Sequence, residues 1–254
     1  MVRGIEIFSV HFSEFSDCYA LIGGSACYLI LNEIGYTPRA TKDLDIVLII
    51  ENFNSDFALA ITDFVEKGGY KNWQSNSGRT HFFRFLDPSD VTFPYMLEIF
   101  SGVPDVLEIG DDSRYTRIPS NKDIASLSAI LMDDAYYRLV RDGKSDIHGI
   151  SIVKAEYLIP LKIKAWMDLA DRKNEGQRIG RHDINKHRGD VFRLSAILSP
   201  ALKISIGDSV SQDMTEGLNR MSADQSLNLS DFGLGTLKVT DVVDLLRSIY
   251  QLNK

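Results

Sequence analysis

The sequence is poor in cysteine and lacks long apolar runs, and each shortage excludes a class of protein. Its 254 residues include two cysteines, Cys18 and Cys27, too few for a disulfide-stapled secreted scaffold. No stretch of 18 apolar residues occurs, and no basic segment precedes an apolar one, so neither a membrane span nor a secretion signal is expected. We therefore expect a cytoplasmic protein with reduced cysteines and no membrane partner.

Positive charge is also in short supply. The chain carries 28 lysines and arginines against 35 aspartates and glutamates, for a formal net charge of −7. A protein that clamps long nucleic acid is usually basic overall, so this balance argues weakly against one, although local basic patches stay compatible with it. A hydrophobic share of 44% and a charged share of 25% are typical of a globular protein.

The most informative stretch begins at Tyr19. Its pattern predicts an apolar strand, a glycine turn and a helix, over Tyr19–Ile22, Gly23–Ser25 and Ala26–Glu33. A second apolar strand, Leu44–Ile50, begins with the carboxylates Asp43 and Asp45. Because side chains alternate along a strand, both aspartates share one face, while Leu44 and Ile46 point into the core. Like charges so placed repel unless a cation lies between them, which favours a divalent-metal site.

Two more strands are expected at Thr80–Leu86 and Tyr95–Phe100. Both are rich in aromatic and branched residues, and the turn cluster Asp87–Asp90 between them predicts an antiparallel hairpin. The second strand contains Glu98, a carboxylate among apolar neighbours, which is rarely buried without a partner. Two interpretations are open: Glu98 pairs with Arg84 across the hairpin, or it is a third metal-binding carboxylate.

Helical periodicity dominates the rest of the chain. Further helices are expected at Ile5–Phe15, Asn52–Lys67, Ser120–Arg141, Leu158–Arg172, Asp183–Leu198, Ser209–Met221 and Thr240–Leu252. The pattern shifts from mixed to helical near residue 115. We therefore expect an α+β protein with two domains: a mixed sheet flanked by helices in residues 1–115, and a mainly helical domain in residues 116–254.

The glycine turn and the paired aspartates together resemble a known motif. Ile22-Gly23-Gly24-Ser25 followed by Asp43-Leu44-Asp45-Ile46 resembles the motif of the polymerase-β-like nucleotidyltransferase superfamily. Including Arg39 and Thr41, the segment Arg39-Ala-Thr41-Lys-Asp43-Leu-Asp45 resembles the AbiEii/AbiGii abortive-infection toxin nucleotidyltransferases. That family also has a lysine motif and a later acidic motif, which Leu161-Lys162-Ile163-Lys164-Ala165 and His182-Asp183-Ile184 match loosely. Lys186 stands where the family often has a second aspartate.

This resemblance implies a nucleotidyltransferase fold whose helical domain closes over a nucleotide. Asp43, Asp45 and Glu98 would be the catalytic carboxylates and would hold two Mg²⁺ ions, or Mn²⁺ in their place. The turn Gly23-Gly24-Ser25 would cradle phosphates at the helix start. Arg39 and Thr41 would line the approach, Lys162 would reach triphosphate oxygens, and Asp183 would contribute to the nucleotide site. Asp183 is equally explained as a helix-capping residue, and Arg39 as a loop residue paired to a surface acid.

The resemblance also implies partners. The donor would be a nucleoside triphosphate, with GTP suggested, the acceptor tRNA, and a cognate antitoxin would restrain a toxin-like activity. Two alternatives stay open: a transferase that modifies a small molecule of the aminoglycoside type, and a nucleotide-binding module without turnover. A broad basic face would favour RNA as the acceptor, and a small acidic pocket would favour a cationic drug.

Overall fold

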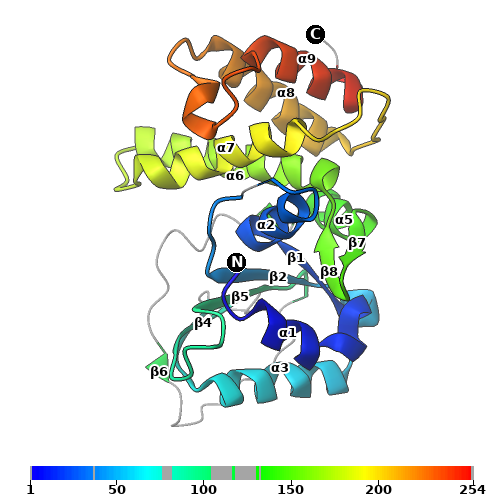
Figure 1. The fold of residues 1–254 in the computed structure, drawn as a ribbon, viewed down its shortest axis with the longest axis vertical. Coiled ribbons are helices and arrows are strands. Elements are labelled where there is room, and N and C mark those ends of the chain that lie inside the picture. The colour runs from blue at the N-terminus through cyan, green and yellow to red at the C-terminus, as the bar shows by residue number, and fades with distance from the viewer. Residues whose placement is uncertain are drawn as a thin grey trace. The chain divides into compact units, whose positions relative to one another are not determined.

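The protein divides into two compact units in a computed structural model that describes residues 2–36, 38–75, 82–103, 116–117, 130–131 and 133–252 (Figure 1). The sheet unit comprises Met1–Met132 and Val140–Lys154, and the helical unit comprises Asp133–Leu139 and Ala155–Lys254. The main boundary therefore lies near residue 154, whereas the sequence analysis placed it near residue 115. The difference arises because a late hairpin pairs with the sheet.

The sheet unit is built on one mixed sheet with the strand order β6-β3-β4-β5-β2-β1-β8-β7. The strands are β1 Tyr19–Ile22, β2 Asp43–Leu48, β3 Tyr70–Ser75, β4 Phe82–Pro88, β5 Met96–Phe100, β6 Thr116–Arg117, β7 Lys144–Ile147 and β8 Ile150–Val153. The pairs β1/β8, β2/β5 and β3/β6 are parallel, and the other neighbours are antiparallel. The expected α+β class and the β4–β5 hairpin are confirmed.

Helices lie on both faces of this sheet. They are α1 Ile5–His11, α2 Gly23–Glu33 and α3 Ser55–Gly68, with 3₁₀ turns at Ser13–Cys18 and Ile50–Asn52. Helices α1 and α3 cover one face, and α2 lies on the other (Figure 1). Local signals define α3: the side chain of Asn54 accepts a hydrogen bond from the Phe57 amide at 2.9 Å, and Gly69 ends the helix with φ 61°.

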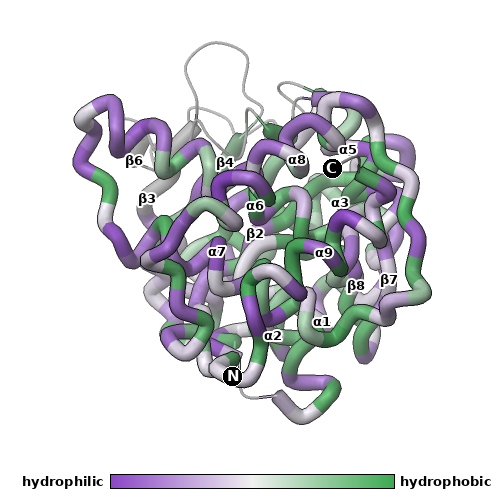
Figure 2. Tube along the Cα trace, turned by 90° about the horizontal axis from the view of Figure 1, so that it is seen from above, coloured by the Kyte–Doolittle hydropathy of each residue, from purple (hydrophilic) through white to green (hydrophobic). Residues whose placement is uncertain are grey.

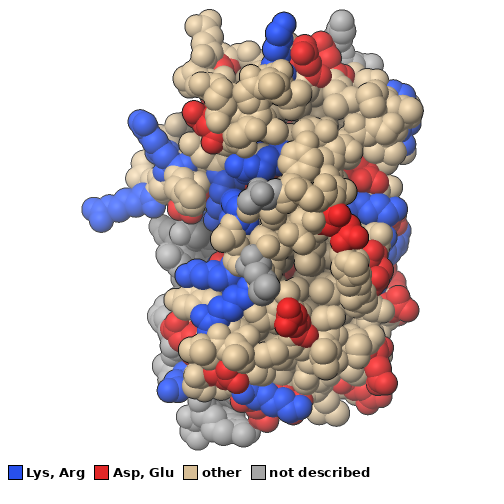
Figure 3. Space-filling view, in the orientation of Figure 1, with Lys and Arg blue, Asp and Glu red and all other residues tan. Residues whose placement is uncertain are grey.

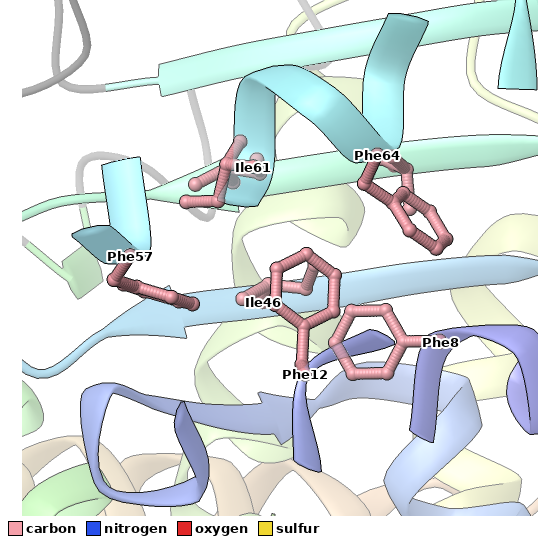
Figure 4. Close-up of a pocket in the computed structure, with 8 residues that line it drawn as sticks. Phe8, Phe12, Ile46, Phe57, Ile61 and Phe64 are labelled. Carbon is pink, nitrogen blue, oxygen red and sulfur yellow. The ribbon is translucent and has the colours of Figure 1, made fainter. Parts of the chain in front are cut away.

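The face under α1 and α3 is a packed apolar core. Figure 4 shows Phe8 of α1 and Phe12, directly after α1, gathered with Phe57, Ile61 and Phe64 of α3 around Ile46 of β2. The ring centroids of Phe8 and Phe12 are 4.6 Å apart, and those of Phe12 and Phe64 are 5.2 Å apart. These side chains leave a cavity of about 10 Å³, which is room for one water at most. This face therefore stabilises the fold and offers no ligand site.

Three expectations for this half of the chain need adjustment. The first helix ends at His11, and its expected continuation is the 3₁₀ turn Ser13–Cys18, in which Phe15 has the non-helical φ of −117°. Strand β3 was not expected because its sequence, Tyr-Lys-Asn-Trp-Gln-Ser, does not read as an apolar strand. Residues 120–129 and 132 of the expected helix Ser120–Arg141 lie outside the described residues, and α5, Asp134–Asp142, ends close to the expected position.

The helical unit contains the remaining helices in the expected order. They are α6 Ala155–Asn174, α7 Arg181–Ser195, α8 Asp208–Ala223 and α9 Val239–Ile249, with a 3₁₀ turn at Leu229–Phe232. Hydrophobic and hydrophilic residues are interspersed along the tube of Figure 2, as amphipathic helices require. Among the described residues, no helix is long and apolar enough to cross a membrane.

Cys18 and Cys27, which lie in the sheet unit, are buried thiols.

A proline inside α6 leaves a backbone carbonyl of that helix to accept a hydrogen bond from the residue after α9. Pro160 has no N–H group, so it cannot donate the helical hydrogen bond to the carbonyl of Glu156. The hydroxyl of Tyr250, directly after α9, donates to that carbonyl instead. Tyr250 is buried, and burial raises the pKa of its hydroxyl, which keeps it protonated as a donor. This hydrogen bond therefore gives the Glu156 carbonyl the donor that α6 does not provide, and it connects the C-terminal end of α9 to α6.

We expect Tyr250→Phe to lower the free energy of unfolding by about 1–2 kcal/mol, because it leaves the part-buried carbonyl of Glu156 without its donor. In a Pro160→Ala background the alanine amide can bond Glu156, so the same Tyr250 substitution should cost less. Urea unfolding of the four proteins of this double-mutant cycle measures the difference. Equal costs in both backgrounds would mean that the hydroxyl does not replace the missing helical bond.

Candidate functional site

Strand pairing brings the predicted carboxylates together on the sheet face opposite α1 and α3. Parallel pairing of β2 with β5 places Asp45 opposite Glu98, and antiparallel pairing of β5 with β4 places Glu98 opposite Arg84. Asp45, Glu98 and Arg84 therefore form one row across three strands. Asp43 lies on the same face one row away, opposite Met96. Asp43, Asp45 and Glu98 are called the carboxylate cluster below.

The glycine turn lies against this cluster. Gly23 has φ +65°, and a Cβ at this position would overlap the Oδ2 atom of Asp45. A Cβ on Gly24 would lie 2.9 Å from the Nη2 atom of Arg39 and 3.1 Å from the Oγ1 atom of Thr41. The structure thus brings Asp45, Arg39 and Thr41 close to the two glycines. Glycine suits positions 23 and 24 because a side chain there would come too close to these residues.

The start of α2 offers backbone donors beside the cluster. The helix begins at Gly23, and among the described residues no side chain caps it. Ser25 is fully buried, and its hydroxyl donates to the carbonyl of Ile22 at 3.2 Å. The Ser25 side chain therefore stabilises the turn, and an anion at the helix start would be bound by backbone N–H groups and not by this hydroxyl.

Glu98 is the most strongly perturbed carboxyl of the cluster. Its side chain is 13% exposed, and the Nε atom of Arg84 donates to its Oε1 at 2.7 Å, with Nη2 donating to the same oxygen. The expected pairing with Arg84 is therefore present. Burial and the adjacent charge of Asp45 outweigh the guanidinium and raise the pKa of Glu98 to about 8.

With a pKa of about 8, the carboxyl of Glu98 holds a proton at neutral pH, beside the carboxyl of Asp45. That proton neutralises part of the repulsion that a cation between the two strands would otherwise remove. The two interpretations of Glu98 are thus compatible, because Arg84 approaches it from β4 while Asp45 approaches it from β2.

The donor set suits a hard cation, although no complete metal centre is formed. Within the described ranges, no group of three or more histidine, cysteine, aspartate or glutamate side chains is arranged to hold a metal ion. Carboxylate oxygens are nevertheless the ligands that Mg²⁺ prefers, and Asp45 and Glu98 lie opposite each other on neighbouring strands. Asp43 lies two residues along β2 from Asp45, on the same face of the sheet.

The two site residues predicted in the helical unit are engaged locally. The Nζ atom of Lys162 lies 2.9 Å from Oδ2 of Asp190, and these side chains are 4% and 2% exposed. Asp183 lies in the first turn of α7, is half exposed, and pairs with Lys186 at 3.5 Å. These contacts support a core role for Lys162 and a helix-start role for Asp183. Their roles toward a nucleotide stay predictions.

Sequence reasoning missed the partner of Lys162. Asp190 lies in the buried segment of α7 that also holds Val191 and Phe192. A carboxylate in such a segment requires a cation, because buried acidic side chains are almost always paired. That signal could have led to Asp190, but the sequence does not indicate which lysine or arginine pairs with it.

Comparison with known proteins identifies no family. No protein-family model matches the sequence, and no curated protein matches it either. The resemblance to the AbiEii/AbiGii nucleotidyltransferases therefore stays a prediction drawn from short motifs. The carboxylate cluster and the glycine turn are therefore the features from which a function can be inferred.

The contact between Gly23 and Asp45 can be tested by adding one methyl group. Gly23→Ala should lower the free energy of unfolding on the order of 2 kcal/mol more than Gly35→Ala, because overpacking adds to backbone strain. Gly35 is the matched control: its φ is +77°, and a Cβ there would have no described atom within 4 Å. Denaturant unfolding compares the two variants. Equal losses would show that Asp45 does not press against the turn.

The raised pKa of Glu98 predicts a pH-dependent stability. The folded protein binds this proton more tightly than the unfolded chain, in which the carboxyl has its ordinary pKa of 4.5. The contribution is therefore fully present below about pH 4.5 and is lost as the pH rises through about 8. Relative to Glu98→Gln, the wild type should lose on the order of 5 kcal/mol of unfolding free energy over this range. Parallel pH profiles for both proteins would contradict the assignment.

Proposed function

We propose that this protein is a metal-dependent nucleotidyltransferase. It would transfer a nucleoside monophosphate from a nucleoside triphosphate to an acceptor hydroxyl or phosphate and release pyrophosphate. The observation that carries the proposal is the placement of Asp45 between the glycine turn and Glu98. Gly23 abuts Asp45 on one side, and Glu98 lies opposite it on β5. Donors for phosphate and acceptors for cations thus lie within one small region of the sheet unit.

The chain's own residues divide this work between them. The N–H groups of Gly23, Gly24 and Ser25 would donate to the phosphates, aided by the positive end of the α2 dipole. Arg39 and Thr41, beside Gly24, would add a cation and a hydroxyl to that anion site. Asp43, Asp45 and Glu98 would hold Mg²⁺, which when bound supplies charge neutralisation at the reacting phosphate. In its ionised form Glu98 would also help to deprotonate the acceptor hydroxyl.

Positive charge beside the start of β2 favours an anionic acceptor. The ammonium of Lys42 lies 3.9 Å from the centroid of the Tyr95 ring, and the guanidinium of Arg3 lies 6.0 Å from it. The backbone N–H of Tyr95 donates to the carbonyl of Lys42, which directly precedes β2. Two cations on one aromatic ring suit RNA better than a cationic drug.

Charge elsewhere argues for a local rather than a broad contact. On the face drawn in Figure 3, basic and acidic side chains are interspersed, so positive charge does not cover it. We therefore keep tRNA as the acceptor to test first and GTP as the first nucleotide, both on the strength of the sequence resemblance. A toxin-like role with a cognate antitoxin belongs to the same proposal.

The direct test is transfer of label from each α-³²P nucleoside triphosphate to total tRNA in the presence of Mg²⁺. We expect label in RNA with wild-type protein and at least a hundredfold less with Asp45→Asn, which keeps the shape of the side chain but removes its charge. Asp63→Asn is the matched control, since Asp63 is a half-exposed partner of Lys67 on α3.

Three other outcomes would count against the proposal. Transfer that survives in Asp45→Asn would place the chemistry elsewhere. Mg²⁺-dependent binding of nucleotide by calorimetry, without transfer to tRNA or to an aminoglycoside, would favour a binding module. Absence of both binding and transfer would contradict the nucleotide site itself.

A further inference from the structure

Arg84 lies in the same row of the sheet as Asp45 and Glu98, but the proposed reaction gives it no role. We propose that Arg84 is a positioning residue, which fixes Glu98 so that only one side of its carboxyl faces Asp45 and a cation. This inference rests on the proposed function, because it concerns how the cluster binds a divalent ion. It adds a requirement that the acidic motifs do not contain, namely a guanidinium on the adjacent strand.

The contacts of Glu98 show how this works. Two N–H groups of Arg84, on Nε and Nη2, both donate to the single oxygen Oε1. Arg84 lies on β4 and Asp45 on β2, so they approach Glu98 from opposite sides of β5. A cation between Asp45 and Glu98 would therefore leave the Arg84 contact intact. Arg84 and the cation would each take one side of the same carboxyl.

Arg84 is itself held in place by aromatic packing. Its guanidinium carbon lies 5.5 Å from the centroid of the Phe82 ring, and Phe82 is fully buried. The Phe82 ring in turn packs against Phe100, with their centroids 5.0 Å apart. Phe82 and Phe100 form the neighbouring row of the same sheet face. The planar guanidinium is thus oriented before any ligand binds, which a lysine ammonium could not reproduce.

The alternative is that Arg84 acts only through its charge. The two roles predict opposite changes in cation affinity when the guanidinium is removed. A positive charge near a cation site weakens cation binding, so an Arg84 that acted by charge alone would hinder it. Removing the guanidinium would then tighten cation binding. If Arg84 positions Glu98, removing it would instead weaken cation binding, because Glu98 would lose its orientation. Arg84→Lys separates the two effects further, since it keeps the charge and loses the planar fork.

The experiment measures Mn²⁺ affinity by electron paramagnetic resonance, without nucleotide or turnover. We expect Arg84→Lys and Arg84→Met each to bind Mn²⁺ about tenfold more weakly than wild type. Arg188→Lys is the matched control, because Arg188 pairs with Asp224 at 2.6 Å and is similarly buried, but belongs to the helical unit. That variant should bind as wild type does. Thermal melts, recorded alongside, confirm that each protein is folded at the measuring temperature.

Each other result overturns the inference in a recognisable way. Tighter binding by Arg84→Met, or wild-type affinity in Arg84→Lys, would show that Arg84 does not position Glu98. If Arg84→Met does not fold, the Arg84→Lys result decides alone. Failure of the wild-type protein to bind Mn²⁺ would contradict the proposed function, and the role of Arg84 with it. The first two results would leave the proposed function standing.

Discussion

Electrostatic repulsion among three carboxyl groups on one sheet face is the constraint on which the candidate site depends. The fold keeps the side chains of Asp43, Asp45 and Glu98 on the same face, because the opposite face of these strands carries the apolar core under α1 and α3. A slip of one residue would expose Ile46 and its neighbours and bury the acids, so core packing fixes the register. The fold therefore holds negative charges together that would separate if left to themselves.

Three features relieve that repulsion without removing it. Burial and the neighbouring Asp45 raise the pKa of Glu98 so that its carboxyl keeps a proton at neutral pH, Arg84 binds the far side of Glu98, and the positive end of α2 abuts Asp45 at Gly23. Of these, the proton on Glu98 is the one that a divalent cation would replace directly. The same positive helix end would also attract a phosphate. The arrangement is thus stable by itself and compatible with the cation and the anionic ligand that the proposed nucleotidyl transfer requires.

The sequence predicted local structure well and long-range pairing poorly. Strand β1, the glycine turn and the shared face of Asp43 and Asp45 followed from alternation and turn chemistry. The parallel register that sets Asp45 against Glu98 did not, because some fifty residues separate them and no local pattern encodes their pairing. The pairing of the β7–β8 hairpin with β1, which extends the sheet unit to residue 154, was not encoded locally either. Nor was the pairing of the buried Asp190 with Lys162.

The central claim is that a divalent cation binds between Asp45 and Glu98. Crystals grown with Mn²⁺ would test it most directly, through anomalous scattering recorded at the manganese absorption edge. We predict an anomalous peak about 2.1 Å from a carboxylate oxygen of each residue, with Arg84 still bound to Oε1 of Glu98. Well-ordered carboxylates without such a peak, in crystals that contain Mn²⁺ well above millimolar concentration, would contradict it.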